Sequence, residues 1–331
     1  MPDRGRSPST LSVAAALGTV YVVWGSTYLA IAYVVETLPP LLAAAVRFVV
    51  AGGGLVAFIA AQQAWRRSRG RGGDIPRPRL VEWRTALIVG VLLLLGGNGL
   101  VSLAEQRIPS GIAAVMIATV PIWMSLFEAV LTRRAPSMLA IGGIAVGLIG
   151  ALILLLPSEG LDSLDPVGVG MVAVSAMAWA TGSLYARRGP LPRNGLLGTG
   201  MEQLAGGLAL AVVAVAIGEP GRLDLSQVSG SSLLGLAYLT VFGSLVAFTA
   251  YTWLLSHVPV TTVATYAYVN PVVAVALGLA FRSEPLTPRT LLAAALIIGA
   301  VVAMVSGRPR EAQETGPAPE AARLERADDA A

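Results

Sequence analysis

Cysteine and lysine are absent from this sequence, and histidine occurs only once, as His257. Without cysteine the chain can form neither disulfides nor thiolate metal sites, and one histidine is too few for a zinc centre. Paired aspartates and an activated serine are also missing from the apolar segments. We therefore expect no enzyme activity, no bound metal and no cofactor.

Charge is scarce as well, since only 13% of the residues are charged while 55% are hydrophobic. The mean hydropathy of +0.72 is far above that of a soluble domain. A helix needs about 20 apolar residues to cross a hydrocarbon core of about 30 Å. Ten runs of this kind are predicted to span a membrane: 11–34, 40–62, 85–104, 109–131, 136–156, 166–187, 195–217, 231–256, 259–281 and 287–305. The expected fold class is an all-α integral membrane protein.

All 23 basic residues are arginines, and their distribution predicts the orientation of the chain. If the amino terminus is cytoplasmic, 18 arginines fall in cytoplasmic segments, four fall outside, and Arg47 is left within a span. The positive-inside rule then predicts that both termini are cytoplasmic. We expect the Arg-rich segment 66–84 to contact anionic lipids rather than nucleic acid. Residues 306–331 are predicted to be a disordered cytoplasmic tail.

The sequence also contains a weak internal repeat. The proline pair Pro109 and Pro121 has the same internal spacing as the pair Pro259 and Pro271, and the second pair lies 150 residues after the first. Together with matching glycine and tryptophan positions, this divides the chain into halves of five helices each, 1–157 and 158–305. Because five is odd, the second half must enter the membrane from the opposite face. Such an inverted repeat is typical of transporters that work by alternating access.

Pro121 and Pro271 lie about twelve residues into their predicted helices, which places them near the centre of the bilayer. Proline leaves the carbonyl four residues earlier without a donor, and lipid cannot satisfy that carbonyl. We expect both prolines to line a polar cavity. The alternative is a packing kink whose free carbonyl is satisfied by the hydroxyl of Thr119 or Thr265.

Each half carries one deep charge, Arg47 in the second span and Glu202 in the seventh. A buried charge costs at least ~2.5 kcal/mol on insertion scales, so each should face water, a partner or a solute. One water or a bound zwitterion would bridge them if their helices face each other. Alternatively, both side chains snorkel to the nearest interface. A carboxylate in an apolar setting exchanges protons readily, which makes Glu202 the candidate for proton coupling.

Further candidates for the cavity wall are polar and aromatic residues in the middle of spans: Trp24, Ser26, Tyr28, Asn98, Trp179, Tyr266, Tyr268 and Asn270. Tyr266 and Asn270 are four residues apart and should share a helix face, whereas Tyr268 should point elsewhere. Asn98 lies among glycines and has an alternative role as a polar contact between helices.

Four motifs resemble the drug/metabolite transporter superfamily, in particular its EamA-type exporters: "VVWGSTYLAI" (22–31), "LPPLLAAAVRF" (38–48), "GGNGLVSLAEQRIPSGIAAVMIATVPIW" (96–123) and "ATYAYVNPVVAV" (264–275). The resemblance covers 11–305. It implies ten helices in the cytoplasmic (inner) membrane of a bacterium, with helices 5 and 10 outside a central cavity. Trp24, Arg47, Asn98, Glu105 and Glu202 match positions of this group.

From these features we expect a secondary transporter that exports a small organic solute, amino acid-like or a drug, by alternating access. Coupling to protons is left open. The alternatives are an uncoupled facilitator or exchanger, and a membrane protein with a structural or sensory role. The expected partners are the small-molecule substrate and the lipid bilayer, and both a monomer and a homodimer remain open.

Overall fold

The computed structural model describes residues 8–70, 75–108, 113, 116–133, 138–155, 165–270, 272–273, 277 and 288–306. Within these ranges all regular structure is helical, as the hydropathy predicts. Six helical segments are long and apolar enough to cross a membrane: Thr10–Val35, Pro40–Ser68, Leu80–Ala104, Pro166–Arg188, Gly195–Ala216 and Gly230–His257. Shorter apolar helices cover Val120–Thr132, Ile141–Gly150 and Leu291–Ala300. The all-helical class is thus confirmed for the described residues, and the apolar helices are consistent with a membrane protein.

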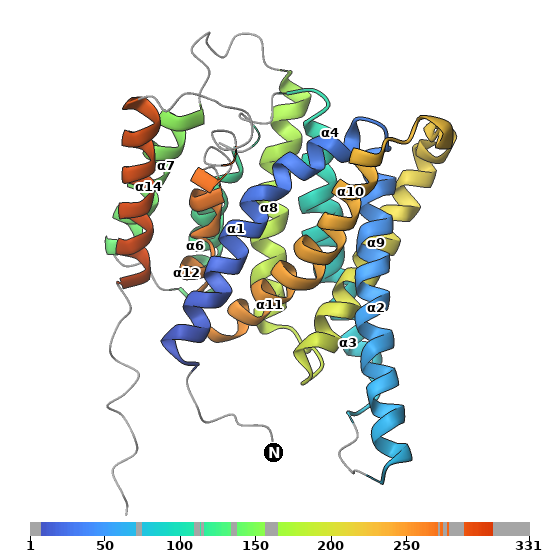
Figure 1. Cartoon of the computed structure of the whole chain (residues 1–331). Coiled ribbons are helices and arrows are strands. Elements are labelled where there is room, and N and C mark those ends of the chain that lie inside the picture. The colour runs from blue at the N-terminus through green and yellow to red at the C-terminus, as the bar shows by residue number, and fades with distance from the viewer. Residues whose placement is uncertain are drawn as a thin grey trace, which may run out of the picture.

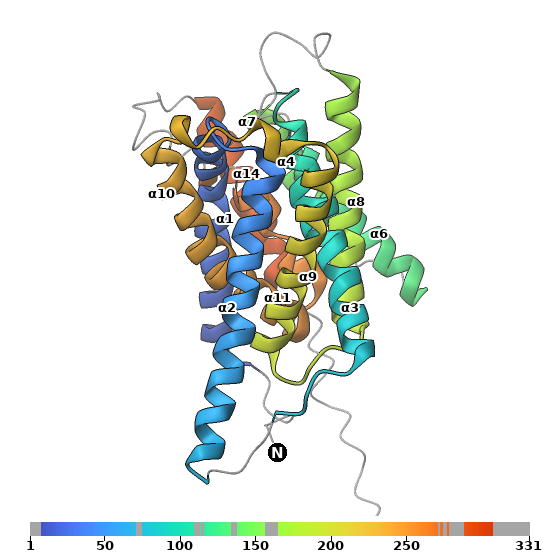
Figure 2. The same ribbon diagram turned by 90° about the vertical axis from the view of Figure 1, so that its right-hand side faces the viewer.

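The long helices run side by side in a bundle (Figures 1 and 2). They are α1 (Thr10–Val35), α2 (Pro40–Ser68), α3 (Leu80–Gly90) with its continuation α4 (Leu100–Ala104), α8 (Pro166–Arg188), α9 (Gly195–Ala216), and α10 (Gly230–Tyr238) with its continuation α11 (Phe248–His257). We call the end where α1 begins, at the bottom of Figure 1, the amino-terminal end of the bundle. The connection from α8 to α9 and the last turn of α11 lie at the same end.

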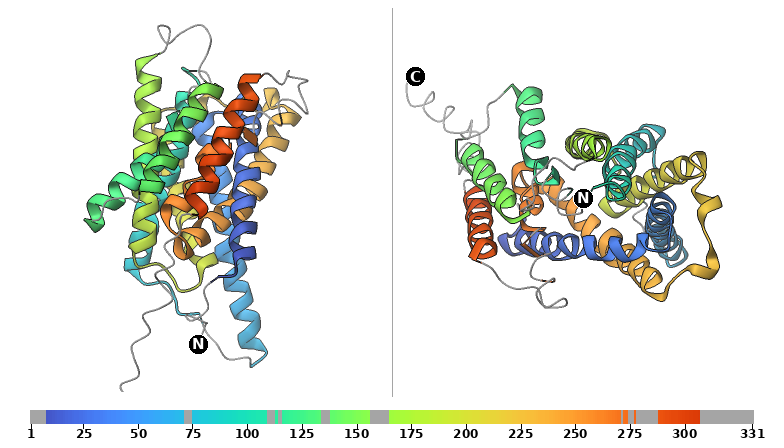
Figure 3. Two further views of the ribbon diagram at one scale, coloured as in Figure 1. Left: turned by 90° about the vertical axis from the view of Figure 1, so that its left-hand side faces the viewer. Right: turned by 90° about the horizontal axis from the view of Figure 1, so that it is seen from above.

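Two helices, α7 (Met138–Leu155) and α14 (Pro288–Ser306), pack against each other at one edge of the bundle, as Figure 3 shows from above. A Cβ atom placed on Gly150 would lie 2.9 Å from Cγ1 of Ile297, so the two helices are in close contact. Of the shorter helices, α6 (Val120–Thr132) extends outward beside α8, and α12 (Val260–Val263) follows α11. The pair of α7 and α14 therefore forms one edge of the described structure.

The starts of α2 and α9 are stabilised in different ways. Asn194 caps α9 from its own chain segment, because its side chain accepts the N–H of Leu197 at 3.0 Å. Pro39 leaves α2 without a side-chain cap of its own. Instead the buried carboxylate of Glu219, in the 3-10 helix η2 (Glu219–Arg222), accepts the backbone N–H of Leu41 at 3.2 Å and of the next residue at 2.7 Å. The second half of the chain thus caps a helix of the first half.

Glycines bring the backbone of α9 against both α2 and α3. A Cβ atom on Gly52 of α2 would lie 2.4 Å from the amide nitrogen of Leu204. A Cβ atom on Gly90 of α3 would lie 2.4 Å from the carbonyl oxygen of Glu202, and one on Gly207 of α9 would lie 2.8 Å from the nitrogen of Val49. Small residues permit such approach between helices in a membrane. We call these sites the glycine contacts.

The α3–α4 and α10–α11 segments are each interrupted by nine residues of π-helix, η1 (Val91–Gly99) and η4 (Leu239–Ala247). The two π-helices begin 148 residues apart, close to the spacing of the proline repeat. A π-helix holds an extra residue in its turn and often occurs at functional sites. Hydropathy does not distinguish it from an α-helix, which is why the sequence did not predict it.

The structure corrects the predicted position of Pro121. The helix α6 begins at Val120, so Pro121 lies in its first turn rather than midway through a helix. The chain turns at Ala118 and Thr119, and the Thr119 hydroxyl donates to the carbonyl of Met116 at 2.5 Å. Proline is well tolerated in a first turn because its missing N–H would be unpaired there anyway.

The second half has a similar turn at Ala264 and Thr265. The Thr265 hydroxyl donates to the carbonyl of Thr262 at 2.6 Å, just as Thr119 does in the first half. The amide of Ala267 reaches the carbonyl of Ala264 at 3.1 Å, and the helical segment 266–270 follows. Pro109 and Pro271 lie outside the described residues.

Candidate solute cavity and crevice

A central cavity of about 90 Å³ lies between α1, α2, η1, α8, α11 and the segment 266–270. Among the residues proposed from the sequence, those in its wall are Trp24, Arg47, Asn98, Trp179, Tyr266 and Asn270. Ser175 and Phe248 add further lining that the sequence did not indicate. Both halves of the chain therefore contribute to one cavity.

Three aromatic residues of the cavity wall, Trp24, Trp179 and Tyr266, form a cluster with the fully buried Tyr251. The rings of Trp24 and Trp179 meet edge to face with centroids 5.5 Å apart, and Tyr266 meets Trp24 in the same way at 4.9 Å. The hydroxyl of Tyr251 accepts a hydrogen bond from Nε1 of Trp179 at 2.9 Å and lies 2.5 Å from the hydroxyl of Ser183. Since the polar edges are paired, the rings present a fixed apolar face.

Arg47 is the buried cation of this cavity, with 6% of its surface exposed. Its Nε donates to the hydroxyl of Ser244 at 2.7 Å, and its guanidinium carbon lies 4.5 Å from the centre of the Phe48 ring. A Cβ atom on Gly243 would lie 2.8 Å from the guanidinium, so this glycine of η4 leaves room for the side chain. Within the described part of the chain Arg47 forms no ion pair. No described carboxylate therefore balances its charge at the cavity wall.

The cavity also contains an acceptor without a donor. Oδ1 of Asn270 is buried and has no hydrogen-bond partner in the described structure. Tyr266, four residues earlier, lines the same cavity, as expected from helical spacing. A guanidinium donor and an amide acceptor beside aromatic rings fit a small molecule that has both an acidic and a basic group.

Glu202 lines a different space, a crevice of about 760 Å³ between the α8–α9 connection, α9 and α11. The residue is 1% exposed, and its Oε2 has no hydrogen-bond partner among the described residues. Arg47 and Glu202 are thus not brought together in one cavity. A connection runs through the next residue, because Nε2 of Gln203 donates at 3.1 Å to the carbonyl of Ser244, whose hydroxyl accepts from Arg47.

The other predicted site residues lie elsewhere. Ser26 donates to the carbonyl of Val23 and pairs with the hydroxyl of Tyr238 at 2.5 Å. Tyr268 packs against Gly147 of α7, away from the cavity. Pro121 is buried but is not in the cavity wall.

Tyr28 and Glu105 are the remaining residues singled out from the sequence. The side chain of Tyr28 lies outside the described structure. Glu105 directly follows α4, and its Oε1 is buried without a partner in the described ranges. Where the placement of residues is described, no group of three or more His, Cys, Asp or Glu residues is arranged to hold a metal ion.

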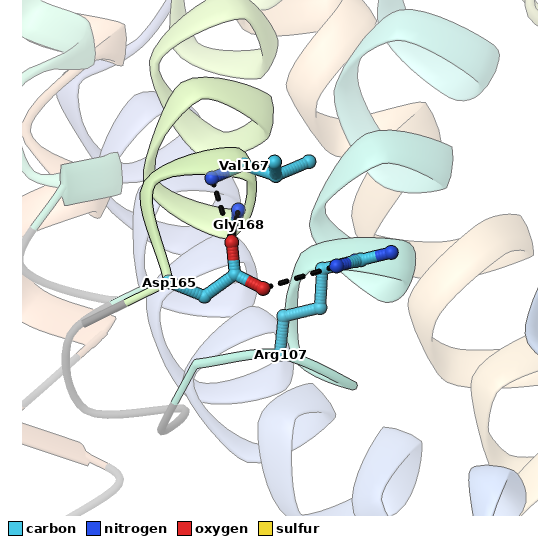
Figure 4. Close-up of polar contacts among 4 residues, drawn as sticks. All are labelled: Arg107, Asp165, Val167 and Gly168. Atoms are coloured by element: carbon cyan, nitrogen blue, oxygen red, sulfur yellow. Dashed lines mark hydrogen bonds and ion pairs between the residues drawn. The ribbon is translucent and has the colours of Figure 1, made fainter. Parts of the chain in front are cut away.

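An ion pair connects the two halves (Figure 4), at the end of the bundle where α8 begins, opposite the amino-terminal end (Figure 1). Nη1 of Arg107 donates to Oδ2 of Asp165 at 3.0 Å, while Oδ1 of Asp165 accepts the backbone N–H of Val167 and Gly168 at the start of α8. The hydrogen bond from Arg107, followed by that from Val167, lowers the pKa of Asp165 below its usual value. The carboxylate stays ionised and holds the start of α8 beside the end of α4.

Comparison with known proteins gives a consistent result. The profile of the EamA-like transporter family matches residues 11–156 and again 166–306. The chain is 40% identical over 296 residues to the uncharacterized inner membrane transporter YedA of Escherichia coli (strain K12), which covers 88% of this chain and 90% of YedA. It is 27% identical over 288 residues to protein PecM of Dickeya dadantii, covering 85% and 88% of the two chains. A solved crystal structure with 21% identity has the same fold, with a TM-score of 0.69 over 89% of this chain and 96% of that one.

Proposed function

The chain belongs to the EamA-like transporter family, and on that premise we propose that it exports a small organic solute through the central cavity by alternating access. Its relative YedA is named as an inner membrane transporter, and the described helices include several that are long and apolar enough to cross a membrane. Membership of the family implies membrane transport, and we propose the solute, the direction and the mechanism below.

For the topology we propose ten spans in two inverted repeats of five helices, 1–157 and 158–305. The family profile matches twice, η1 and η4 occupy equivalent places, and Trp24 and Trp179 meet at the cavity. Because the predicted spans put 18 of the 23 arginines on one side, we propose that the amino-terminal end of the bundle faces the cytoplasm. The same side is proposed for the tail 306–331, of which all but residue 306 lies outside the described structure. The membrane is then the bacterial inner membrane, where YedA is placed by its name.

The solute that fits the cavity is an amino acid-like zwitterion with an apolar side chain. Its carboxylate pairs with the guanidinium of Arg47, its ammonium donates to Oδ1 of Asn270, and its side chain packs on Trp24 and Trp179. The observation that supports this assignment is the buried Arg47, which faces an aromatic cavity without an ion-pair partner among the described residues.

Transport into proteoliposomes of the purified protein tests the proposal. The probes are radiolabelled L-leucine, L-phenylalanine and L-threonine. Replacing Arg47 by Gln removes the charge-assisted bond to the carboxylate, so we expect uptake of the preferred probe to fall about tenfold or more. Arg47→Lys keeps the charge and should retain part of the uptake. Arg84→Gln, at an exposed arginine of α3, is the matched control. Uptake by Arg47→Gln at the rate of the unmodified protein would contradict the assignment.

Coupling to protons at Glu202 is the second part of the proposal, with an uncoupled facilitator or exchanger as the alternative. Glu202 is buried beside Tyr251 of α11, and the exposed Arg187, Arg193 and His257 line the same crevice. An imposed pH gradient should drive uptake by the unmodified protein but not by Glu202→Gln. If both respond equally to the gradient, Glu202 does not couple transport to protons.

A further inference from the structure

The crevice that Glu202 lines is separate from the central cavity and has a different composition. Its walls come from the α8–α9 connection, α9 and α11, whereas the central cavity is formed largely by α1, α2, η1 and α8. None of the residues that line the central cavity also lines the crevice. The crevice is also the larger space, about 760 Å³ compared with about 90 Å³.

Oxygen atoms without donors gather in the buried wall of this crevice. Oε2 of Glu202 and Oγ1 of Thr249 are both buried and have no hydrogen-bond partner within the described ranges. The hydroxyls of Thr199 and Thr252, which pair with each other at 2.7 Å, line the same crevice. A buried carboxylate without a donor is costly, and an ammonium group supplies the donors and the charge that it lacks.

The outer part of the crevice has the opposite charge. The side chains of Arg187 and Arg193 line it and are exposed. Nη1 of Arg187 donates to the carbonyl of Val258 at 3.1 Å. His257 also lines the crevice, and its ring stacks on Trp253 with centroids 4.4 Å apart. A negative inner wall and a basic rim are complementary to a molecule that is positive at one end and negative at the other.

We propose that this crevice is a second binding site for a zwitterionic solute, whose ammonium donates to Glu202 and Thr249 while its carboxylate faces Arg193 and His257. The class of solute and the cytoplasmic orientation of the crevice rest on the proposed function, whereas the binding site itself does not. With that orientation, the crevice takes up the solute on the cytoplasmic side before it reaches the central cavity.

Trp253 provides a local reporter for this site, because Trp24 and Trp179 belong to the central cavity. The experiment titrates the full-length protein in nanodiscs with L-leucine, L-threonine and L-lysine while intrinsic tryptophan fluorescence is recorded. Subtracting the titration of Trp253→Phe isolates the signal of the crevice. We expect a saturable change with at least one probe. The N-acetyl form of that probe lacks the ammonium and should bind about tenfold more weakly or worse.

Variants at the inner wall identify the groups responsible. Glu202→Gln and Thr249→Val remove the charge and the hydroxyl with little change in volume, so each should weaken the Trp253 signal, Glu202→Gln by about tenfold or more. Glu128→Gln, at a carboxylate that pairs with Arg188 outside the crevice, is the matched control and should leave the signal unchanged. If no probe changes the Trp253 signal, or if both crevice variants bind like the unmodified protein, the second site is disproved.

Arg47→Gln separates this inference from the proposed function. It should lower transport about tenfold or more while the affinity read from the Trp253 signal is unchanged, because Arg47 is not in the wall of the crevice. Should transport be absent in the unmodified protein while the Trp253 signal persists, the function fails and the second site stands. If transport depends on Arg47 but no probe changes the Trp253 signal, the proposed function is supported and the second site is disproved.

Discussion

Two helices of this protein, α2 and α9, pack on each other, and each carries one buried charge, yet the two charges have different surroundings. Arg47 of α2 bonds to Ser244, stacks on Phe48 and faces the central cavity. Glu202 of α9 leaves one carboxylate oxygen without a donor in the described structure and faces the crevice. Two helices that pack on each other thus carry buried charges with different contacts, and each charge lines a different space.

We expect the largest effect from a change at the glycine contacts, since these contacts hold α9 against α2 and α3, the helices that carry or adjoin both charges. Gly90→Ala places a Cβ atom 2.4 Å from the carbonyl oxygen of Glu202, which is backbone and unable to move aside. We expect the free energy of unfolding to fall by about 3 kcal/mol. Gly53→Ala is the matched control, because a Cβ atom there meets nothing within 4 Å. Equal unfolding midpoints of the two variants in detergent would show that the contact is not needed.

Removing one hydroxyl near each buried charge compares their surroundings: Ser244 bonds to Arg47, and Thr249 lines the crevice with Glu202. Ser244→Ala leaves Nε of the buried Arg47 without its acceptor, which should lower the free energy of unfolding by about 2 kcal/mol. Thr249→Val removes a hydroxyl that has no partner in the described ranges and should change it by less than about 0.5 kcal/mol. Chemical unfolding of both variants measures the difference. A larger loss for Thr249→Val would reverse the comparison.

The helix starts offer a milder contrast. Glu219→Ala frees the amides of Leu41 and Leu42 at the start of α2, and we expect a loss of about 1.5 kcal/mol because a charged cap is removed. Asn194→Ala removes the neutral cap of α9, and about 1 kcal/mol should be lost. Thermal unfolding in detergent ranks the two variants. If Asn194→Ala is the more damaging, the cap from the second half is not the stronger one.

The smallest effect is expected at the exposed pair of Arg107 and Asp165. The pKa of Asp165 is lower in the folded protein than in the unfolded chain, so its contribution to stability is present above the ordinary pKa of about 3.9. It is lost as the pH falls through the lower pKa of the folded state. Asp165→Asn keeps the helix cap but not the charge. Its unfolding midpoint should lie slightly below that of the unmodified protein at pH 7 and coincide with it at low pH. A difference that grows on acidification would contradict this sign.

The positions of the long helices could be predicted from the sequence because the thickness of the bilayer dictates the length of an apolar run. The predicted span 166–187 corresponds to α8 (Pro166–Arg188), and 195–217 to α9 (Gly195–Ala216). In α2 the helix continues to Ser68, beyond the predicted end at 62, since the polar residues there favour a helix as well. Hydropathy reports where the apolar segment ends rather than where the helix ends.

The surroundings of single side chains were harder to predict, since they depend on how each helix is rotated. Tyr251 was missed because the rings of Trp24 and Trp179 that surround it come from helices far away in the sequence. Glu202 was expected at the central cavity, but its side chain lines the crevice while its backbone carbonyl lies against Gly90 of α3. The turn before Pro121 was also missed, because it depends on tertiary contacts and hydropathy carries no information about them.

The glycine contacts also have a mechanical consequence. Where α9 touches α2 and α3 backbone to backbone, separating the helices would leave bare backbone facing a void. This line of contact therefore joins two helices of the first half, α2 and α3, to a helix of the second half. If the two halves move by alternating access, as proposed above, they would move about this line, and the tilt that three touching helices allow would limit the size of the solute.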